Sequence, residues 1–424
     1  MPASRTIGVW ALIGLMLNNM IGSGIFGVPG ELARMLGRAS PAACVFAGLA
    51  IAVIIACFVE VGSQFSDSGG PYLYVRTAFG RLLGIQVGWF TALAPMAAAA
   101  AQATLFASYL AGFYPTAGFG IGRAATIVGV VTLPVVANLI GVRTGKGLSS
   151  LLVVAKLLPL AALIIAGIVF IASTSATPAP APAAASPIAS NTWFAAVLIA
   201  VFSYGGFENA LAATGDVRDP RRFVPLALTA SLVLCMLVNT LVQWVTSRAL
   251  EHADGLDRPL AAAGSVVMGP AGATLISVAA LISTAGAISA TVLAVPRLLA
   301  ALGERGDIPA LFARTREGGA PVVATLTVAV IAILLGVSGT FKWALAVTAG
   351  SMTIFASAVC AALPRLRSVQ PSAPAVRVPG GRVLAVVGIV VSALLLLQLE
   401  AREVAPIAIT AVIALVNWWL VRKR

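Results

Sequence analysis

Charged side chains are scarce in this chain of 424 residues. Only 10% of the residues are Asp, Glu, Lys or Arg, whereas 60% are hydrophobic. Soluble domains carry about 25% charged residues, so the composition excludes an ordinary soluble domain. The mean hydropathy of +1.02 indicates an integral membrane protein surrounded by a lipid bilayer.

Cysteine and histidine are also rare, and this excludes several kinds of site. The single histidine, His252, stands beside Glu251 and Asp254 in a polar stretch. A metal centre needs more imidazole or thiolate ligands than this, so we expect a solvated loop residue and no cofactor. The four cysteines fall in apolar runs at unrelated spacings and are interpreted as small packing residues: Cys44, Cys57, Cys235 and Cys360.

Long apolar runs recur along the whole sequence. A membrane-spanning helix needs about 20 apolar residues. The first run follows a short polar leader without a small-residue cleavage site, so we interpret it as a retained helix. We predict an all-α membrane protein forming one domain over residues 1–424, with twelve transmembrane helices at residues 7–33, 41–64, 84–113, 123–140, 148–172, 193–214, 224–247, 270–302, 320–338, 341–364, 381–399 and 404–421.

The basic residues predict the orientation. Most of the 27 lysines and arginines fall in the segments that lie on the same side as the N-terminus if twelve spans are present. Cytoplasmic loops carry this excess, so we expect both termini in the cytoplasm and a location in the cell's inner membrane. The net charge of +13 is spread over many segments and not clustered as in a nucleic-acid-binding patch, so we expect no nucleic acid partner.

A short Gly-Ser-Gly sequence interrupts the first apolar run at Gly22, Ser23 and Gly24. Irregular backbone inside a membrane is tolerated only where it is buried in protein or lines a polar cavity. The half-helix that begins here presents unpaired amides at its positive end, which can bind a carboxylate. The carbonyl groups near Met20 and Ile21 end the preceding half-helix and can accept hydrogen bonds from an ammonium group.

A second glycine-rich interruption follows in the sixth run, at residues 203–208. We expect further free carbonyl groups near Phe202 and Gly205. Paired breaks in two halves of a chain indicate a substrate site at the membrane midplane, and a zwitterionic α-amino acid headgroup matches the two polarities. The alternative is that these glycines only allow close helix packing. The adjacent intramembrane Glu208 favours the site.

The sequence resembles the amino acid-polyamine-organocation transporter superfamily. Gly-Ser-Gly-Ile-Phe followed by Pro29 is similar to the signature of its first helix. Further matches extend along the chain: Ser68-Gly69-Gly70-Pro71-Tyr72, Gly80, Gly88-Trp89, Gly141-Val142-Arg143, Phe207-Glu208, the segment 219–225, Arg297 and Gly306-Asp307-Ile308-Pro309.

This resemblance implies the leucine-transporter-like fold and an amino acid permease or antiporter. Two inverted repeats of five helices would cover residues 7–172 and 193–364, with two additional helices at 381–421. Helices 1 and 6 would be discontinuous. The resemblance also implies that the substrate headgroup is held by backbone groups matching Met20, Ile21, Gly22, Ser23, Gly24, Phe202 and Gly205.

Differences from one branch of the superfamily reduce the range of candidate substrates. The arginine/agmatine antiporters carry a tryptophan and an asparagine where this chain has Thr291 and approximately Ala99. Without the aromatic platform for a cation, we predict a preference for neutral amino acids; the alternative is a cationic amino acid or polyamine antiporter. The alanines between Ala94 and Ala100 either leave room for an apolar side chain or allow close helix packing, and the sequence leaves both open.

Three charged residues fall within predicted spans, where each is costly. Glu60 lies near a cytoplasmic helix end, and we expect an ion pair with an inner arginine. For Glu208, the resemblance implies a gating or proton-accepting role.

Lys156 lies about eight residues, or roughly 12 Å, inside the fifth span, too deep for easy snorkelling. Its ammonium therefore needs internal acceptors, for which the carbonyl groups near Ile21 and Gly22 are candidates. The resemblance implies that it stands where sodium-coupled relatives hold a sodium ion. We predict sodium-independent transport that is proton-coupled or exchanging; the alternative is a fixed structural cation.

Other classes of membrane protein fit the sequence less well. An enzyme needs a nucleophile–base pair or a metal cluster, and the predicted spans contain no such group. A channel needs filter rings of carbonyls or charges, whereas broken internal repeats favour alternating access. We therefore predict a secondary transporter and not an enzyme, and the sequence leaves its oligomeric state open.

Overall fold

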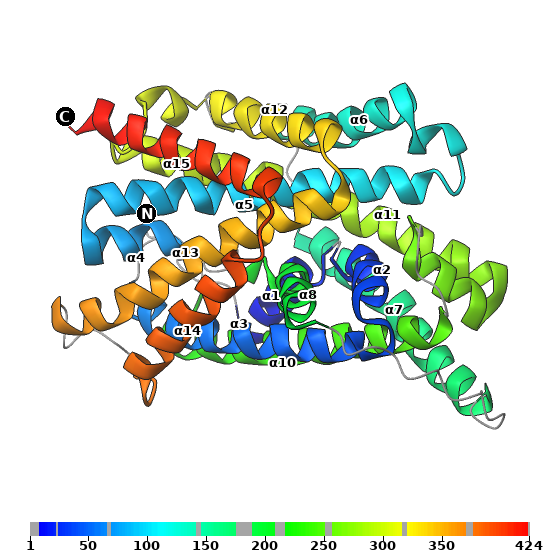
Figure 1. The fold of residues 1–424 in the computed structure, drawn as a ribbon. Helices are drawn as coiled ribbons and strands as arrows, with labels where there is room; N and C mark the ends of the chain where they lie inside the picture. The colour runs from blue at the N-terminus through cyan, green and yellow to red at the C-terminus, as the bar shows by residue number, and fades with distance from the viewer. Residues whose placement is uncertain are drawn as a thin grey trace.

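The computed structural model describes residues 8–22, 24–65, 69–140, 146–174, 189–207, 217–250, 257–315, 320–369 and 376–422. These residues form helices joined by short connections (Figure 1). The α-helices are α1 Val9–Met20, α2 Gly24–Leu36, α3 Ser40–Gly62, α4 Gly70–Phe79, α5 Arg81–Leu110, α6 Gly120–Leu139, α7 Lys146–Thr174, α8 Ser190–Val201, α10 Pro220–Ala249, α11 Pro259–Glu304, α12 Val322–Ser338, α13 Phe341–Val369, α14 Gly381–Leu396 and α15 Ala401–Val421. Short 3₁₀ turns are η1 Gly37–Ala39, η2 Pro115–Gly118, η3 Phe202–Tyr204 and η5 Ala310–Ala313.

The helix lengths agree with a multi-pass membrane protein. Within the described ranges, eight helical segments are long and apolar enough to cross a bilayer, and four shorter apolar helices accompany them. Each apolar run predicted from the sequence overlaps one or more of these helices. Helix α11 begins eleven residues before the predicted run at 270–302. The predicted start coincides with a kink at Gly269, whose φ is 73°.

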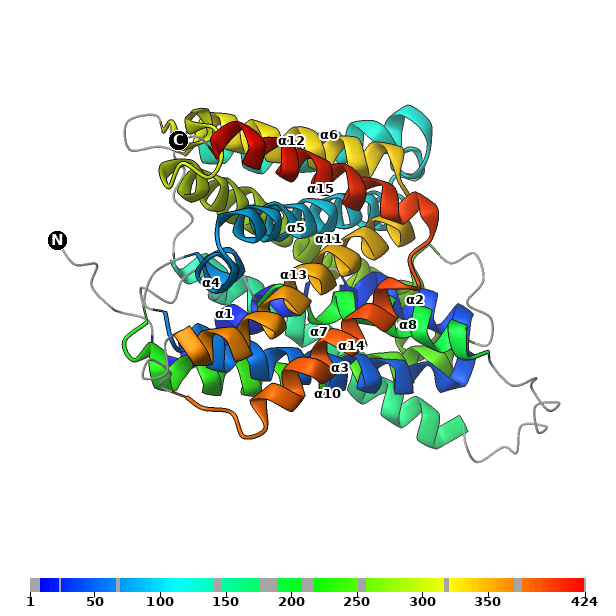
Figure 2. The same ribbon diagram turned by 60° about the vertical axis from the view of Figure 1, so that its left-hand side comes forward.

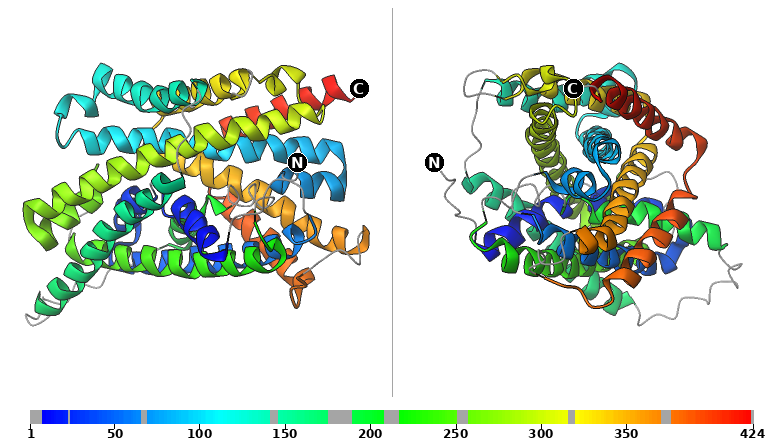
Figure 3. Two further views of the ribbon diagram at one scale, coloured as in Figure 1. Left: turned by 180° about the vertical axis from the view of Figure 1, so that it is seen from behind. Right: turned by 90° about the vertical axis from the view of Figure 1, so that its left-hand side faces the viewer.

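The long helix α5 lies at the centre of the bundle (Figure 1). It packs against α4, α6, α11, α12, α13 and α15. Helices α3 and α10 run side by side along the lower edge of the view in Figures 1 and 2. The short helices α1, α2 and α8 lie between this pair and α5. Helix α7 crosses α10 and reaches one end of the bundle (Figure 3). The interrupted helices are therefore enclosed by longer, continuous ones.

A buried aspartate joins four parts of the chain at the end of the bundle near α4. Asp307 is fully buried and accepts hydrogen bonds from the Tyr72 hydroxyl and from the Nε atoms of Arg76 and Arg81, both at 2.7 Å. Its backbone carbonyl accepts a hydrogen bond from the Asn417 side chain at 2.8 Å. Helix α4 and the start of α5 are thus fixed to the Asp307 carboxylate, and the last helix is fixed to its backbone carbonyl.

A second buried carboxylate joins α3 to the end of α13. The carboxylate oxygens of Glu60 lie 2.5 and 2.7 Å from the Nε and Nη2 atoms of Arg367. The backbone amide of Val378 donates to the same carboxylate at 2.8 Å. The expectation that Glu60 forms an ion pair with an arginine is confirmed. Glu60 is completely buried, so bidentate pairing is what makes its charge tolerable.

Removing the charge of Asp307 is expected to destabilise the protein. Asp307→Asn leaves two guanidinium groups without their buried carboxylate, a change that costs about 3 kcal/mol in comparable sites. The measurement is the denaturation midpoint of purified protein in detergent. The control is Glu31→Gln, which removes a partly exposed pair with Arg34 and should cost less than about 1 kcal/mol. Equal midpoints for the two variants would contradict the role given to Asp307.

Candidate functional site

The first break lies between α1 and α2. Helix α1 ends at Met20, and Ile21 leaves helical geometry with ψ at 70°. Helix α2 restarts at Gly24 and has no acidic residue in its first turn. The unpaired amides and the positive dipole end of α2 therefore open into the centre of the bundle. The carbonyl end of α1 faces the same region. Ser23 lies outside the described residues.

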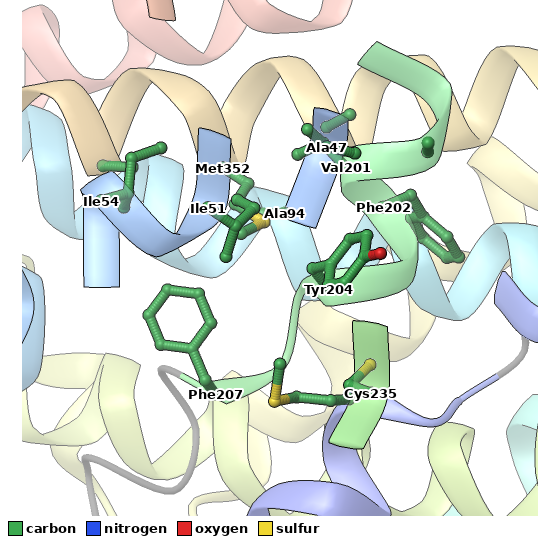
Figure 4. Close-up of a cluster of buried hydrophobic side chains, with 14 of the residues drawn as sticks. Ala47, Ile51, Ile54, Ala94, Val201, Phe202, Tyr204, Phe207, Cys235 and Met352 are labelled. Atoms are coloured by element: carbon green, nitrogen blue, oxygen red, sulfur yellow. The ribbon is translucent and has the colours of Figure 1, made fainter. Parts of the chain in front are cut away.

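The second break follows α8. The chain passes from Val201 through the 3₁₀ turn η3 into Gly205, which is extended. Two aromatic contacts fix this segment to α3: the Tyr204 hydroxyl donates to the Cys44 carbonyl at 2.6 Å, and the Phe207 ring meets Phe58 edge to face at 5.3 Å. Figure 4 shows Phe202, Tyr204 and Phe207 projecting from this segment in different directions. Glu208 lies outside the described residues.

The two breaks touch each other through glycine. Gly206 has a φ of 98°, and a β-carbon on it would lie 2.6 Å from the Asn19 carbonyl oxygen. A β-carbon on Gly24 would lie 2.8 Å from the Ser203 hydroxyl oxygen. The sequence predicts that Gly24 makes room for a ligand. The structure shows that Gly24 makes room for Ser203. Only glycine permits this backbone approach at both positions.

One cavity of about 70 Å³ lies where the breaks meet. Of the residues predicted from the sequence, six line it: Met20, Gly22, Gly24, Phe202, Gly205 and Thr291. Ile21 does not, although it is buried beside the cavity. Sequence reasoning missed several other lining residues: Asn18, Asn19, Pro95, Gln102, Gly206, Ala287, Ala290, Thr348 and Met352. The described lining contains no Asp, Glu, Lys or Arg.

The alanine-rich stretch of α5 has two roles. Ala94 and Ala98 line the cavity. Ala97 and Ala100 belong to the largest hydrophobic core, and Ala99 packs in a second core with α6, α11 and α12. Ala99, which the resemblance places approximately at the antiporters' asparagine, therefore faces neighbouring helices and does not line the cavity.

Lys156 bridges α7 and the end of α1. Its ammonium nitrogen lies 2.9 Å from the side-chain oxygen of Asn18, 3.1 Å from the Asn18 carbonyl and 3.4 Å from the Ile21 carbonyl. Only 2% of the residue is exposed. Gly22, the other expected acceptor, instead has its carbonyl 3.5 Å from the Ser283 hydroxyl. Sequence reasoning considered only backbone carbonyls as acceptors and missed Asn18, whose side chain makes the shortest contact.

The carbonyl groups expected to be free already accept internal hydrogen bonds. The Met20 carbonyl accepts from the Gly22 amide at 2.9 Å, and the Phe202 carbonyl accepts from the Gly205 amide at 3.2 Å. Buried backbone groups are almost always paired in this way. Because each carbonyl has two lone pairs, these groups can still accept from an ammonium. The positive end of α2 and the negative ends of α1 and α8 thus suit a small zwitterion.

A larger cavity of about 730 Å³ lies farther along α2. Gly27 and Gly30 line it, one and two turns beyond Gly24. The ring of Phe341 lies directly over Gly27, because a β-carbon there would be 2.2 Å from it. Charged side chains from several helices and their connections surround this cavity: Glu31, Arg123, Asp257, Arg258 and Lys342.

Comparison with known proteins agrees with this geometry. The model of the amino acid permease family matches residues 7–419. The chain belongs to this family. The family comprises multi-pass membrane transporters, and nothing in the comparisons points to catalysis.

Individual relatives are similar over most of this chain. The serine/threonine exchanger SteT of Bacillus subtilis is 26% identical over 72% of this chain and 69% of its own length. The methylthioribose transporter of the same organism is 27% identical over 73% of this chain and 70% of its own length. The vacuolar cationic amino acid transporter 4 of Arabidopsis thaliana is 26% identical over 76% of this chain and 57% of its own length.

Replacing Gly206 should separate the two breaks. Gly206→Ala places a methyl group against the Asn19 carbonyl and forces a strained backbone that costs about 1–3 kcal/mol. We expect amino acid binding to weaken at least about tenfold, measured by ligand-induced thermal stabilisation. Gly14→Ala on α1 is the control, because a β-carbon there meets nothing within 4 Å. If both variants bind like the wild type, the contact between the breaks does not shape the site.

Proposed function

We propose that this protein is a secondary transporter of neutral amino acids. The observation that carries the proposal is the convergence of three helix ends on one cavity. The amino end of α2 favours a carboxylate and the carboxyl ends of α1 and α8 favour an ammonium, while the described lining adds no charged side chain. The backbone groups would thus bind the headgroup of the amino acid, and the uncharged remainder of the cavity would accommodate a neutral side chain.

We also propose the complete membrane topology. Helices α1 and α2 together would form the first of twelve spans, and α8 with the segment after it the sixth. The two breaks would then occupy equivalent positions in inverted repeats at residues 7–172 and 193–364, followed by two additional helices at 381–421. Arg76, Arg81 and Arg367, which pair with Asp307 and Glu60, lie near the ends of α4, α5 and α13. Arginines concentrate on the cytoplasmic side of membrane proteins, so their positions support cytoplasmic termini.

A cationic amino acid or polyamine antiporter is the alternative, favoured by the similarity to the cationic amino acid transporter. That function needs an acid or an aromatic platform for the distal cation. Thr291 occupies the position where the resemblance predicts such a platform, and the described lining supplies no carboxylate. We therefore favour the neutral substrate.

Transport in proteoliposomes separates the two functions. We expect saturable counterflow of small neutral L-amino acids, with arginine and agmatine competing at least about tenfold more weakly, a difference of about 1.4 kcal/mol. Amino alcohols that lack the carboxylate should also compete weakly. A tenfold preference for arginine would establish the alternative, and a nonsaturating conductance would exclude a carrier.

We further propose that Lys156 replaces a coupling sodium ion. Its ammonium touches the carbonyl end of α1 where the helix breaks, so its protonation state affects the geometry beside the substrate cavity. Loss of its proton would remove the attraction for the Asn18 and Ile21 oxygens. Glu208 adjoins the second break, and the proposal gives it a gating or proton-accepting role. Coupling would be to protons or to substrate exchange, without sodium.

The coupling proposal predicts the behaviour of Lys156→Ala. The variant should lose amino acid accumulation driven by a pH gradient in liposomes, while exchange of substrate between the two sides remains. Arg382→Ala is the control, because Arg382 is an exposed cation at the start of α14 that lines neither cavity. Wild-type uptake that requires sodium and ignores the pH gradient would refute the role of Lys156.

A further inference from the structure

The side chain of Gln102 stands out among the residues around the central cavity. It lies on α5, only 7% of the residue is exposed, and it lines the cavity. Its carbonyl oxygen Oε1 is buried and has no hydrogen-bond partner among the described residues. Leaving a buried acceptor unpaired costs about 1–3 kcal/mol. A cost of this size calls for a function that uses the free acceptor.

The position of Gln102 on α5 places its carboxamide beside a small pocket. Ala94, Ala98 and Gln102 follow one another at four-residue intervals and therefore share one face of the helix. The two alanines leave space below the carboxamide. The opposite walls are formed by Ala290 and Thr291 of α11 and by Thr348 and Met352 of α13. The pocket is continuous with the part of the cavity that the two breaks line, since a β-carbon on Gly205 would lie 3.2 Å from the Met352 sulfur.

The polar atoms of this pocket favour a hydrogen-bond donor. Thr348 already donates its hydroxyl proton to the Ala344 carbonyl in its own helix, at 2.8 Å. It can therefore offer only lone pairs to a ligand. The Gln102 Oε1 atom is likewise an acceptor. The Nε2 group of the same carboxamide can donate, and a substrate hydroxyl group, which both donates and accepts, matches these atoms better than a methyl group does.

We propose that Gln102 determines specificity by accepting a hydrogen bond from the side-chain hydroxyl of the substrate. The preferred substrates would be small hydroxyl-bearing amino acids, serine and threonine. This inference rests on the proposed function of amino acid transport. A site built around such a bond rejects analogues that cannot make it, because the buried acceptor then stays unpaired. Threonine and valine are nearly equal in shape, so they isolate this effect.

The test compares inhibition constants for threonine and valine, and for serine and alanine, in counterflow by reconstituted wild-type protein. We expect threonine to bind at least about tenfold more tightly than valine. In Gln102→Met, which keeps the length and volume of the side chain, the ratio should fall close to one, mainly through weaker threonine binding. Gln86→Met on the same helix is the control, since Gln86 bonds the Ala411 carbonyl outside the cavity and should leave the ratio unchanged.

The outcomes separate this inference from the proposed function. Wild-type protein that exchanges amino acids but binds valine as tightly as threonine would overturn the role of Gln102 alone, and this result needs no variant to fold. An unchanged ratio in folded Gln102→Met would do the same. Wild-type protein that exchanges no amino acid would instead overturn the transport proposal.

Discussion

Backbone polarity inside an apolar bundle is the constraint on which the rest of this structure depends. A helix that stops in the middle of a membrane leaves amides and carbonyls unpaired, and lipid cannot pair them. The protein meets this constraint by enclosing both breaks among longer helices and by bringing them into contact with each other. Gly24 and Gly206 allow that contact, and Lys156 and the local turns satisfy several carbonyls. The central cavity is the space that remains between the two breaks.

The helices around the breaks are held together in part by buried ion pairs. Asp307 and Glu60 are completely buried, and each is neutralised by arginine. Both clusters connect parts of the chain that lie far apart in the sequence. Beside the cavity, the Lys156 ammonium bridges α7 and α1, and other helices are joined by uncharged hydrogen bonds, such as that from the Tyr204 hydroxyl to the Cys44 carbonyl. The paired carboxylates therefore hold parts of the chain away from the cavity, and backbone carbonyls accept most of the contacts beside it.

Much of this arrangement could be predicted from the sequence, because glycine and charge leave strong local signals in an apolar chain. The breaks at Gly22 and Gly205 were visible for this reason, as was the need of Glu60 for an arginine. Gln102 could not be found in the same way, since the run of alanines before it, residues 97–101, has no alternation of polar and apolar residues that tells which way the Gln102 side chain points. The contact between Asn18 and Lys156 depends on how α1 crosses α7, and local sequence does not determine that crossing.

The glycines on α2 have a mechanical consequence. Gly24, Gly27 and Gly30 occur at successive turns, and Ser203, Phe341 and Pro259 rest directly on their backbone. Helices normally interlock through ridges of side chains, and such ridges resist sliding. This side of α2 has no ridges at those positions. The Phe341 ring instead contacts the helix backbone itself, so the wall that Gly27 and Phe341 give the larger cavity depends on the absence of a single methyl group from α2.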